Sequence, residues 1–221
     1  ELLEDATKII SAALGLDRRE ARIEARALAA HAWQINTTWL LAHDSDPQSR
    51  SNITHFESLI ARRIKGEPVA YIVGEREFFG LKIVVTPDVL IPRPETEILV
   101  QAVLEKMNPD VALRVLDLGT GSGAIATALA RHRPMANVLA VDISSAALAI
   151  AQINAQNLGI TNMSFATSDW YDNLGSDAFD VIISNPPYVE AEDPHLNRGD
   201  ACYEPVSARA SGVTGMEDIA I

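Results

Sequence analysis

The hydrophobic and polar positions of this chain follow different periods in its two parts. Through residue 66, apolar residues recur at the three- and four-residue spacing of amphipathic helices, and no stretch alternates as a strand would. Trp33 and Trp39 fall in this part. We expect both to anchor the core of a small helical bundle, with an aromatic recognition face as the alternative. Residues 1–68 are therefore predicted to form a helical domain that could recognise a substrate.

Between residues 69 and 92 the pattern changes to short extended runs. Residues 69–73 and 81–85 are rich in β-branched side chains, and Gly74 and Gly80 follow or precede them. Such runs bounded by glycine are typical of strands joined by tight turns. We predict a hairpin-like connector over residues 69–92.

From residue 93 onward, short apolar runs alternate with helical segments. Strands are predicted over residues 113–118, 137–143, 163–167 and 181–184, and helices over residues 95–107, 124–131 and 146–158. Such alternation with right-handed crossovers produces a parallel, doubly wound sheet, here with strand order 3-2-1-4. The fold class is therefore α/β, with a Rossmann-like domain over residues 93–221 behind the small all-helical domain.

The first of these strands runs into a glycine-rich loop that opens a helix. Glycines let the backbone approach a ligand closely, and the free N–H groups of the helix start face that ligand. The spacing also fits the dinucleotide fingerprint, so the loop is compatible with NAD as well as with S-adenosylmethionine. Asp117, at the strand end, would repel a pyrophosphate but suits an ammonium group. The predicted cofactor contacts here are Asp117, Gly119, Thr120, Gly121, Ser122 and Gly123.

Two further strand ends carry acids. Asp142 lies about 20 residues beyond the glycines, where an acid can accept hydrogen bonds from ribose hydroxyls; helix capping is the alternative. The third strand is followed by Asp169 and Trp170. Asp169 could accept from an adenine amino group while Trp170 packs on the ring, or Trp170 could be a core residue of a surface loop.

The fourth strand ends in Asn185-Pro186-Pro187-Tyr188. The Asn185 side-chain carbonyl and the Pro186 backbone carbonyl can each accept one hydrogen of a planar NH2 group. Proline fixes φ and carries no N–H, which holds the loop with its carbonyls outward. Tyr188 offers a flat apolar face. Asn185, Pro186 and Tyr188 are the predicted catalytic residues of a methyl transfer to an amide or amine, and Asn185 also borders the cofactor. Since this loop has no role in hydride transfer, S-adenosylmethionine is the favoured cofactor, with S-adenosylhomocysteine as product.

These motifs, together with four longer stretches, resemble the HemK/PrmC-type protein-(glutamine-N5) methyltransferases. The stretches are Gly74 to Phe79, Leu90 to Glu97, Asp193 to Leu196 and Tyr203 to Pro205. The resemblance implies methylation of the Gln in the Gly-Gly-Gln loop of peptide chain release factors, with Asn185 to Tyr188 contacting that Gln. It also implies that Arg93 and Glu95 line the mouth of the site, whereas simple helix capping is the alternative for Pro94-Glu95.

The resemblance leaves related functions open. A ribosomal-protein glutamine N5-methyltransferase shares these motifs, and a nucleic-acid N6-adenine methyltransferase shares the amine-holding loop. A catalytically idle S-adenosylmethionine-binding module is opposed by the intact Asn185 to Tyr188 motif. The family's sheet has seven strands, whereas four are predicted here, so we expect the catalytic domain to be incomplete at the C-terminus, with further strands beyond Ile221.

Charge and composition narrow these alternatives. The net charge is −12; residues 1–68 carry 9 basic and 10 acidic side chains, whereas residues 69–221 carry 9 and 20. This acidic second part argues against direct binding of nucleic acid, which requires Lys and Arg at phosphates. One cysteine and no metal-ligand spacing among the 5 histidines predict a reducing, cytoplasmic location without a metal. We expect no membrane segment and a monomer.

Overall fold

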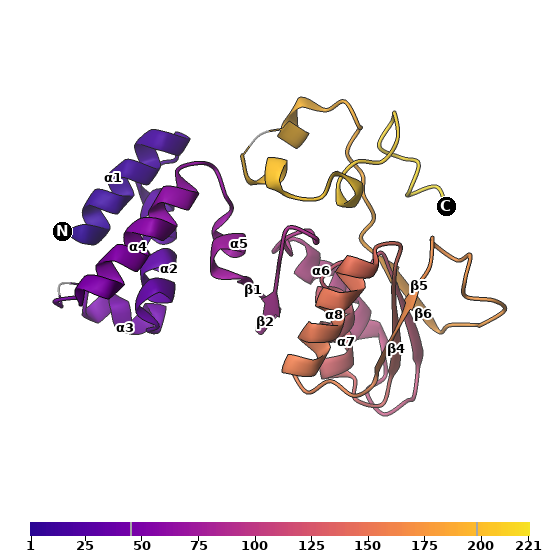
Figure 1. The fold of residues 1–221 in the computed structure, drawn as a ribbon. Coiled ribbons are helices and arrows are strands. Elements are labelled where there is room, and N and C mark those ends of the chain that lie inside the picture. The colour runs from indigo at the N-terminus through magenta and orange to yellow at the C-terminus, as the bar shows by residue number, and fades with distance from the viewer. Residues whose placement is uncertain (45, 198) are drawn as a thin grey trace. The chain divides into compact units, whose positions relative to one another are not determined.

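The structure is a computed structural model that describes residues 1–44, 46–197 and 199–221 (Figure 1). Contacts divide the chain into two compact units. The first comprises Glu1–Gly74 and Gly199–Tyr203, and the second comprises Glu75–Arg198 and Glu204–Ile221. The limits at residues 68 and 92 between the helical domain, the connector and the Rossmann-like domain stay a prediction.

The first unit is helical in its described residues, as the sequence predicts. Its helices are α1 Leu2–Leu14, α2 Arg18–Trp33, α3 Thr37–Ala42, α4 Arg50–Arg63 and α5 Val69–Val73. Alanines on one face of α2 are buried and allow close helix packing, while Ile10, Leu28, Leu40 and Phe56 fill the space between the helices. The core of this unit is therefore contributed mainly by α1, α2 and α4.

The two tryptophans of this unit have different surroundings. Trp33 is buried and packs against Phe56, with ring centroids 5.6 Å apart. Trp39 is 44% exposed and stacks on His43. The core prediction is confirmed for Trp33 and wrong for Trp39, because Leu40 is the residue of the short helix α3 that reaches the core.

A distant piece of chain completes the helical unit. The buried guanidinium of Arg63 donates to the carboxylate of Glu24 at 2.8 and 2.9 Å and to Asp200 at 2.8 Å. The hydroxyl of Tyr203 donates to the carbonyl of Lys65 at 2.6 Å. Residues Gly199–Tyr203 thus belong to this unit by their hydrogen bonds as well as by proximity.

The connector differs in part from its prediction. Residues 69–73 form the helix α5, which ends at Gly74 with a left-handed φ of 82°, so the expected strand is wrong here. A run of five apolar residues fits a buried helical turn as well as a strand. The hairpin itself is present, with β1 Glu75–Phe78 paired antiparallel to β2 Leu81–Val84. Its turn residues, Phe79 and Gly80, both have positive φ.

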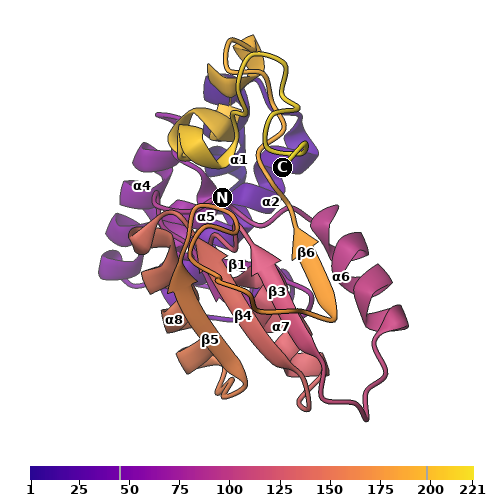
Figure 2. The ribbon, with the colours of Figure 1, turned by 90° about the vertical axis from the view of Figure 1, so that its right-hand side faces the viewer.

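The second unit contains a four-stranded parallel sheet. Its strands are β3 Arg114–Leu118, β4 Asn137–Asp142, β5 Met163–Thr167 and β6 Val181–Ser184. They lie in the order β5-β4-β3-β6 (Figure 2), which confirms the predicted order 3-2-1-4. All three pairings are parallel.

Helices α6 Thr96–Lys106, α7 Ala124–His132 and α8 Ser145–Asn157 accompany the sheet. Helices α7 and α8 cover one face of it (Figure 1), and α6 packs against α7. Beyond β6 the described chain forms short 3₁₀ helices, Pro194–Asn197, Gly199–Tyr203 and Val206–Ala208. The fold therefore combines the predicted helical unit with a Rossmann-like α/β unit.

Candidate active site

The strand register brings three predicted motifs to one edge of the sheet. Leu118 of β3 pairs with Val141 of β4 on one side and with Ser184 of β6 on the other. The next residues are therefore neighbours where the parallel strands end. These residues are Gly119, Asp142 and Asn185. Ligands of open parallel sheets bind outside this carboxyl edge.

The glycine loop depends on glycine at each of its three positions. Gly119, Gly121 and Gly123 have φ values of 68°, 55° and 77°. A Cβ on Gly123 would lie 2.8 Å from the Cβ of Ala151, so this glycine lets α7 and α8 approach. A Cβ on Gly119 or Gly121 would meet nothing within 4 Å. The first two glycines therefore border open space that a ligand can occupy.

Asp142 holds this loop in place. One oxygen of its carboxylate accepts the backbone N–H of Gly121 at 2.8 Å, and the other accepts that of Ser144 at 2.9 Å. Ser144, not Asp142, is the N-cap of α8, since its hydroxyl accepts from the N–H of Ala147 at 3.2 Å. Each carboxylate oxygen retains a lone pair for a further donor. The capping alternative is thereby excluded, while ribose binding by Asp142 stays a prediction.

Asn154 supports the same loop from below. Its fully buried side chain lies on α8, accepts the N–H of Val84 at 2.7 Å and donates to the carbonyls of Val84 at 3.0 Å and Ser122 at 2.9 Å. One amide thus joins β2, α8 and the glycine loop. This residue was not singled out from the sequence, although its place between Ile153 and Ala155 in α8 was an available signal.

Asp117 lies beneath the loop, away from the cavity wall. It is completely buried, and one carboxylate oxygen accepts from the hydroxyl of Thr120 at 2.6 Å. The other oxygen has no hydrogen-bond partner within the described structure. Burial raises the pKa of Asp117 from 3.8 to about 7, which the Thr120 hydrogen bond opposes. Its predicted contact with the cofactor remains untested by this geometry.

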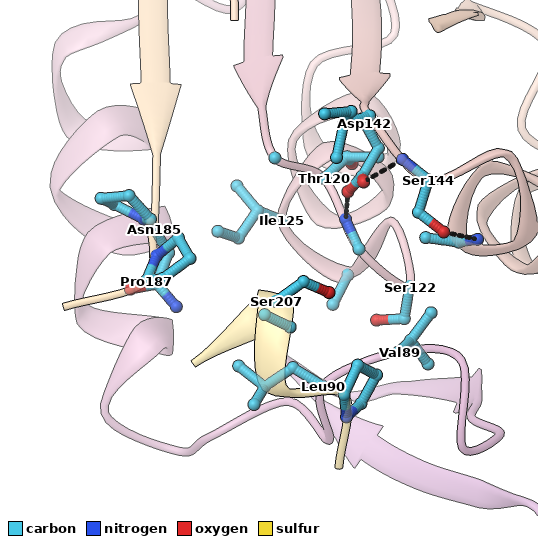
Figure 3. Close-up of a pocket in the computed structure, with 18 of the residues that line it drawn as sticks. Val89, Leu90, Thr120, Ser122, Ile125, Asp142, Ser144, Asn185, Pro187 and Ser207 are labelled. Carbon is cyan, nitrogen blue, oxygen red and sulfur yellow. Dashed lines mark hydrogen bonds between the residues drawn. The ribbon is translucent and has the colours of Figure 1, made fainter. Parts of the chain in front are cut away.

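A cavity of about 550 Å³ opens at this edge of the sheet. Most of its wall residues lie within 87–93, 119–125, 141–147, 168–170, 185–187 and 205–210. In Figure 3, Asp142 and Thr120 lie at one side, Asn185 and Pro187 lie at the other, and Ile125 lies between them. The cavity therefore brings the glycine loop, the acid of β4 and the proline loop to one space.

The proline loop is held at its first residues by the end of β6. The hydroxyl of Ser184 donates to the carbonyl of Leu118 at 2.8 Å, which ties the end of β6 to the end of β3. Asn185, Pro186 and Pro187 line the cavity. Tyr188 is 62% exposed and lies outside the wall, so its predicted contact with a substrate awaits a test.

Trp170 borders both the cavity and the hydrophobic core, so its surroundings are compatible with adenine binding and with a core role. Asp169 and Trp170 line the cavity. Trp170 also packs against the buried residues Leu116, Leu118 and Val141. The indole can therefore belong to the core on one side and face a ligand on the other, and its adenine contact stays a prediction.

Arg93 and Glu95 have different positions. Arg93 lines the cavity, and its guanidinium donates to Glu204 at 2.6 Å. The carboxylate of Glu204 also accepts the N–H of Ile91 at 3.1 Å. Burial raises the pKa of Glu204, although the charge of Arg93 opposes this. Glu95 precedes α6 without a capping hydrogen bond and is not part of the wall.

Several wall residues were not predicted. Val89, Leu90, Ser207 and Ala208 contribute to the cavity, as Figure 3 shows for Val89, Leu90 and Ser207. Leu90 begins a stretch that resembles the family, so that stretch was a usable signal. Ser207 and Ala208 lie in a segment without periodicity, and nothing in the sequence marks them as wall residues.

The groups in the cavity wall suit an organic ligand. Among the described residues, no three His, Cys, Asp or Glu side chains gather in a way that could hold a metal ion. Open space at Gly119 and Gly121 and the carboxylate of Asp142 fit a ligand that carries hydroxyl groups. In the part of the chain that the structure describes, no helix is long and apolar enough to cross a membrane.

Comparisons with known proteins agree with this geometry. The family model "Methyltransferase small domain" matches residues 94–202, and "PrmC N-terminal domain" matches residues 1–74. A release factor glutamine methyltransferase of Bordetella pertussis is 49% identical over 90% of this chain and 74% of its own. The protein of that name from Escherichia coli K12 is 42% identical over 90% of this chain and 71% of its own.

A solved structure is also similar over part of the chain. The T. thermophilus 16S rRNA N2 G1207 methyltransferase in complex with AdoMet and guanosine is 28% identical, with a TM-score of 0.45. The alignment covers 52% of this chain and 32% of that protein.

The fold and the matched domain place this chain among the S-adenosylmethionine-dependent methyltransferases of the Rossmann-like class. It belongs to the release factor glutamine methyltransferase family, as its identity to curated members over most of its length shows. The cofactor is S-adenosylmethionine, which confirms the choice over NAD.

Proposed function

We propose that this chain transfers the methyl group of S-adenosylmethionine to the side-chain amide nitrogen of the glutamine in the Gly-Gly-Gln loop of a peptide chain release factor. The observation that carries this proposal is the place of Asn185, Pro186 and Pro187 in the wall of the cavity that also contains the glycine loop and Asp142. An acceptor for an amide and a site for a methyl donor therefore share one space.

The chemical problem is the weak nucleophilicity of an amide nitrogen. The cofactor supplies an already activated methyl group on a sulfonium. The side-chain carbonyl of Asn185 and the backbone carbonyl of Pro186 can each accept one amide hydrogen, which turns the nitrogen toward the methyl donor. Such orientation can contribute about 7–11 kcal/mol in favourable cases. Pro186 and Pro187 have no N–H to compete for these acceptors.

Charge develops on the nitrogen as the bond to the methyl group forms. Carbonyl oxygens aimed at that nitrogen stabilise the developing positive charge. No strong base is required, because the surplus proton can leave to solvent after transfer. In this proposal Asn185 and Pro186 are the catalytic residues, and Tyr188 packs against the glutamine side chain.

The residues toward the cofactor have separate tasks in this proposal. Asp142 accepts the ribose hydroxyls with the lone pairs that Gly121 and Ser144 leave free. Asp117 lies beneath the loop, where its ionised form would supply negative charge toward the ammonium group. Asp169 and Trp170 bind the adenine. Arg93 and Glu95 belong to the mouth that receives the substrate loop.

The partner is a protein with an exposed Gln-containing loop. The acidic second part of the chain supports a protein substrate over free nucleic acid, since a polyanion would be repelled. We expect the enzyme to act as a monomer in the cytoplasm, where release factors meet the ribosome.

The test is mass spectrometry of a release factor after incubation with the full chain and S-adenosylmethionine. One added methyl group on the Gln of the Gly-Gly-Gln peptide is expected. A release factor with Gln replaced by Ala serves as the substrate control, and ribosomal protein and RNA are assayed in parallel. Methylation of either of those in place of the release factor would contradict the proposal.

A further inference from the structure

Residues 204–212 form a segment of the cavity wall that we call the strap. Its Pro205, Ser207, Ala208 and Ala210 line the cavity. In Figure 3, Ser207 lies between the proline loop and Leu90, opposite the strand ends. The strap therefore borders both the region of the proline loop and the segment that precedes α6.

The strap is attached at its start by Glu204. The side chain of Glu204 is fully buried, and its carboxylate accepts from Arg93 at 2.6 Å and from the N–H of Ile91 at 3.1 Å. A buried carboxylate is costly unless it is paired and hydrogen-bonded. Here each oxygen has a partner, so this attachment ties the strap to the Ile91 to Arg93 segment.

The strap is attached at its far end to the chain that leaves the proline loop. Val189 follows Tyr188 directly, and its N–H donates to the carbonyl of Arg209 at 3.1 Å. The N–H of Ser211 donates to the carbonyl of Val189 at 2.8 Å, and that of Ala191 donates to Gly212 at 2.9 Å. These bonds surround the parallel bridge between Val189 and Ala210.

Arg209 joins the two attachments. Its buried guanidinium donates to the carbonyl of Glu204 at 3.0 Å and to that of Leu196 at 2.8 Å. Its own carbonyl accepts from Val189. A continuous series of hydrogen bonds thus runs from Arg93 through Glu204 and Arg209 to Val189, which is one residue beyond the amide-binding motif.

We infer that Glu204 is a positioning residue, whose carboxylate holds the strap so that Asn185 to Tyr188 keeps its place in the cavity wall. The inference rests on the proposed function, because the motif must orient an amide to a fraction of an ångström. Ser184 fixes the motif only at its beginning. The strap fixes its end.

The first measurement needs no substrate. Hydrogen exchange of the Val189, Ala191 and Ser211 amides is compared in the unaltered chain, Glu204→Gln and Glu204→Ala. Gln preserves the volume and an acceptor for Ile91 but removes the charge that faces Arg93. We expect exchange at these amides to accelerate about tenfold or more in Glu204→Ala and less in Glu204→Gln, because local opening then becomes easier.

The second measurement is methyl transfer at saturating S-adenosylmethionine. Glu204→Ala should lower kcat about tenfold or more while the Kd for S-adenosylmethionine changes less than about threefold, since the strap orients the acceptor amide. The matched control is Asp180→Asn. The carboxylate of Asp180 accepts the N–H of Arg114 at 2.7 Å, at the amino ends of β3 and β6. This control should leave kcat near that of the unaltered chain.

The outcomes separate the inference from the proposed function. Unchanged exchange at Val189, Ala191 and Ser211 in both Glu204 variants overturns the inference, whatever substrate the enzyme accepts. An equal loss of kcat in Asp180→Asn also overturns it, because the effect would then be general destabilisation. A lack of release factor methylation by the unaltered chain overturns the proposed function alone, and exchange still decides the role of Glu204. Should Glu204→Ala not fold, Glu204→Gln and Arg209→Lys provide the same comparison.

Discussion

The carboxylate of Asp142, at the end of β4, accepts the backbone N–H of Gly121 in the neighbouring loop at 2.8 Å. An acid of the cavity wall therefore shapes the glycine loop. Gly121 has a φ of 55°, and its position borders open space. The conformation of the glycine loop therefore depends on the side chain for which ribose binding is proposed.

Asp142→Ala should weaken binding of S-adenosylmethionine by roughly 1.5–3 kcal/mol, since hydrogen bonds to a charged acceptor are lost. Calorimetric titration measures this change. Asp180→Ala removes a carboxylate that accepts a backbone N–H at the amino ends of the strands. This control should leave the affinity for S-adenosylmethionine unaltered. An unchanged affinity in Asp142→Ala would mean that this acid serves the loop conformation only.

Asn185→Ala should reduce turnover far more than it weakens binding of the release factor. In the proposed function the Asn185 carboxamide accepts a hydrogen of the amide that is methylated, and this interaction would strengthen as charge develops on nitrogen. By analogy with a removed oxyanion-hole donor, the rate should fall on the order of 10²–10³-fold. Single-turnover methylation is measured beside a pull-down, with Asn108→Ala on the surface as control. Methylation by Asn185→Ala at the rate of the unaltered chain would mean that Asn185 is only a turn residue.

Asn154→Ala and Asn162→Ala should separate positioning of the cofactor loop from general stability. Asn154 donates to Ser122 in the glycine loop, whereas Asn162 donates to three carbonyls in and just after the last turn of α7, including that of Ala136 at 2.9 Å. Each change leaves backbone groups without partners, which costs about 1–3 kcal/mol. Thermal unfolding should therefore occur at lower temperature in both variants. Only Asn154→Ala should weaken S-adenosylmethionine binding, by about tenfold; equal affinities in the two variants would exclude the positioning role.

Asp117→Asn should change how stability depends on pH. With a pKa of about 7 in the folded state against 3.8 otherwise, Asp117 is protonated in the folded protein while it is ionised in the unfolded chain between these values. The folded state then binds one more proton, so the contribution to stability is complete below pH 3.8 and is lost as the pH rises through about 7.

The loss amounts to at most about 1.4 kcal/mol per pH unit. Urea unfolding of both proteins near pH 5 and near pH 7 measures it. The unaltered chain should gain stability relative to Asp117→Asn at the lower pH. A difference between the two proteins that does not vary with pH would show that Asp117 is ionised in the folded state throughout.

The sequence predicts the sheet and the two main loops well, for a physical reason. Buried parallel strands are continuous apolar runs, and their ends carry the glycine loop and Asn185, so local pattern and register together place these motifs at one edge. Residues 69–73 show the limit of this approach. Five apolar residues fit a strand or one helical turn, and Gly74 ends the helix that forms.

The rest of the site depends on contacts between distant residues. Glu204 is 111 residues from Arg93, and Asn154 is 70 from Val84. No periodicity relates such pairs, because they are brought together only by tertiary packing. Tyr203-Glu204-Pro205 and the stretch around Arg93 both resembled the family, yet the sequence contains nothing that pairs one with the other.

The helical unit consists of two separate stretches of chain, and this limits how it can be transplanted. A graft of residues 1–74 onto another enzyme would carry the buried Arg63 without its Asp200 partner. It would also leave the carbonyl of Lys65 without the hydroxyl of Tyr203. Arg63 would keep its pair with Glu24 but lose its second carboxylate, which lowers the stability of the unit. The helical unit therefore cannot be transferred as residues 1–74 alone. A chimera that keeps the unit intact must also include residues 199–203.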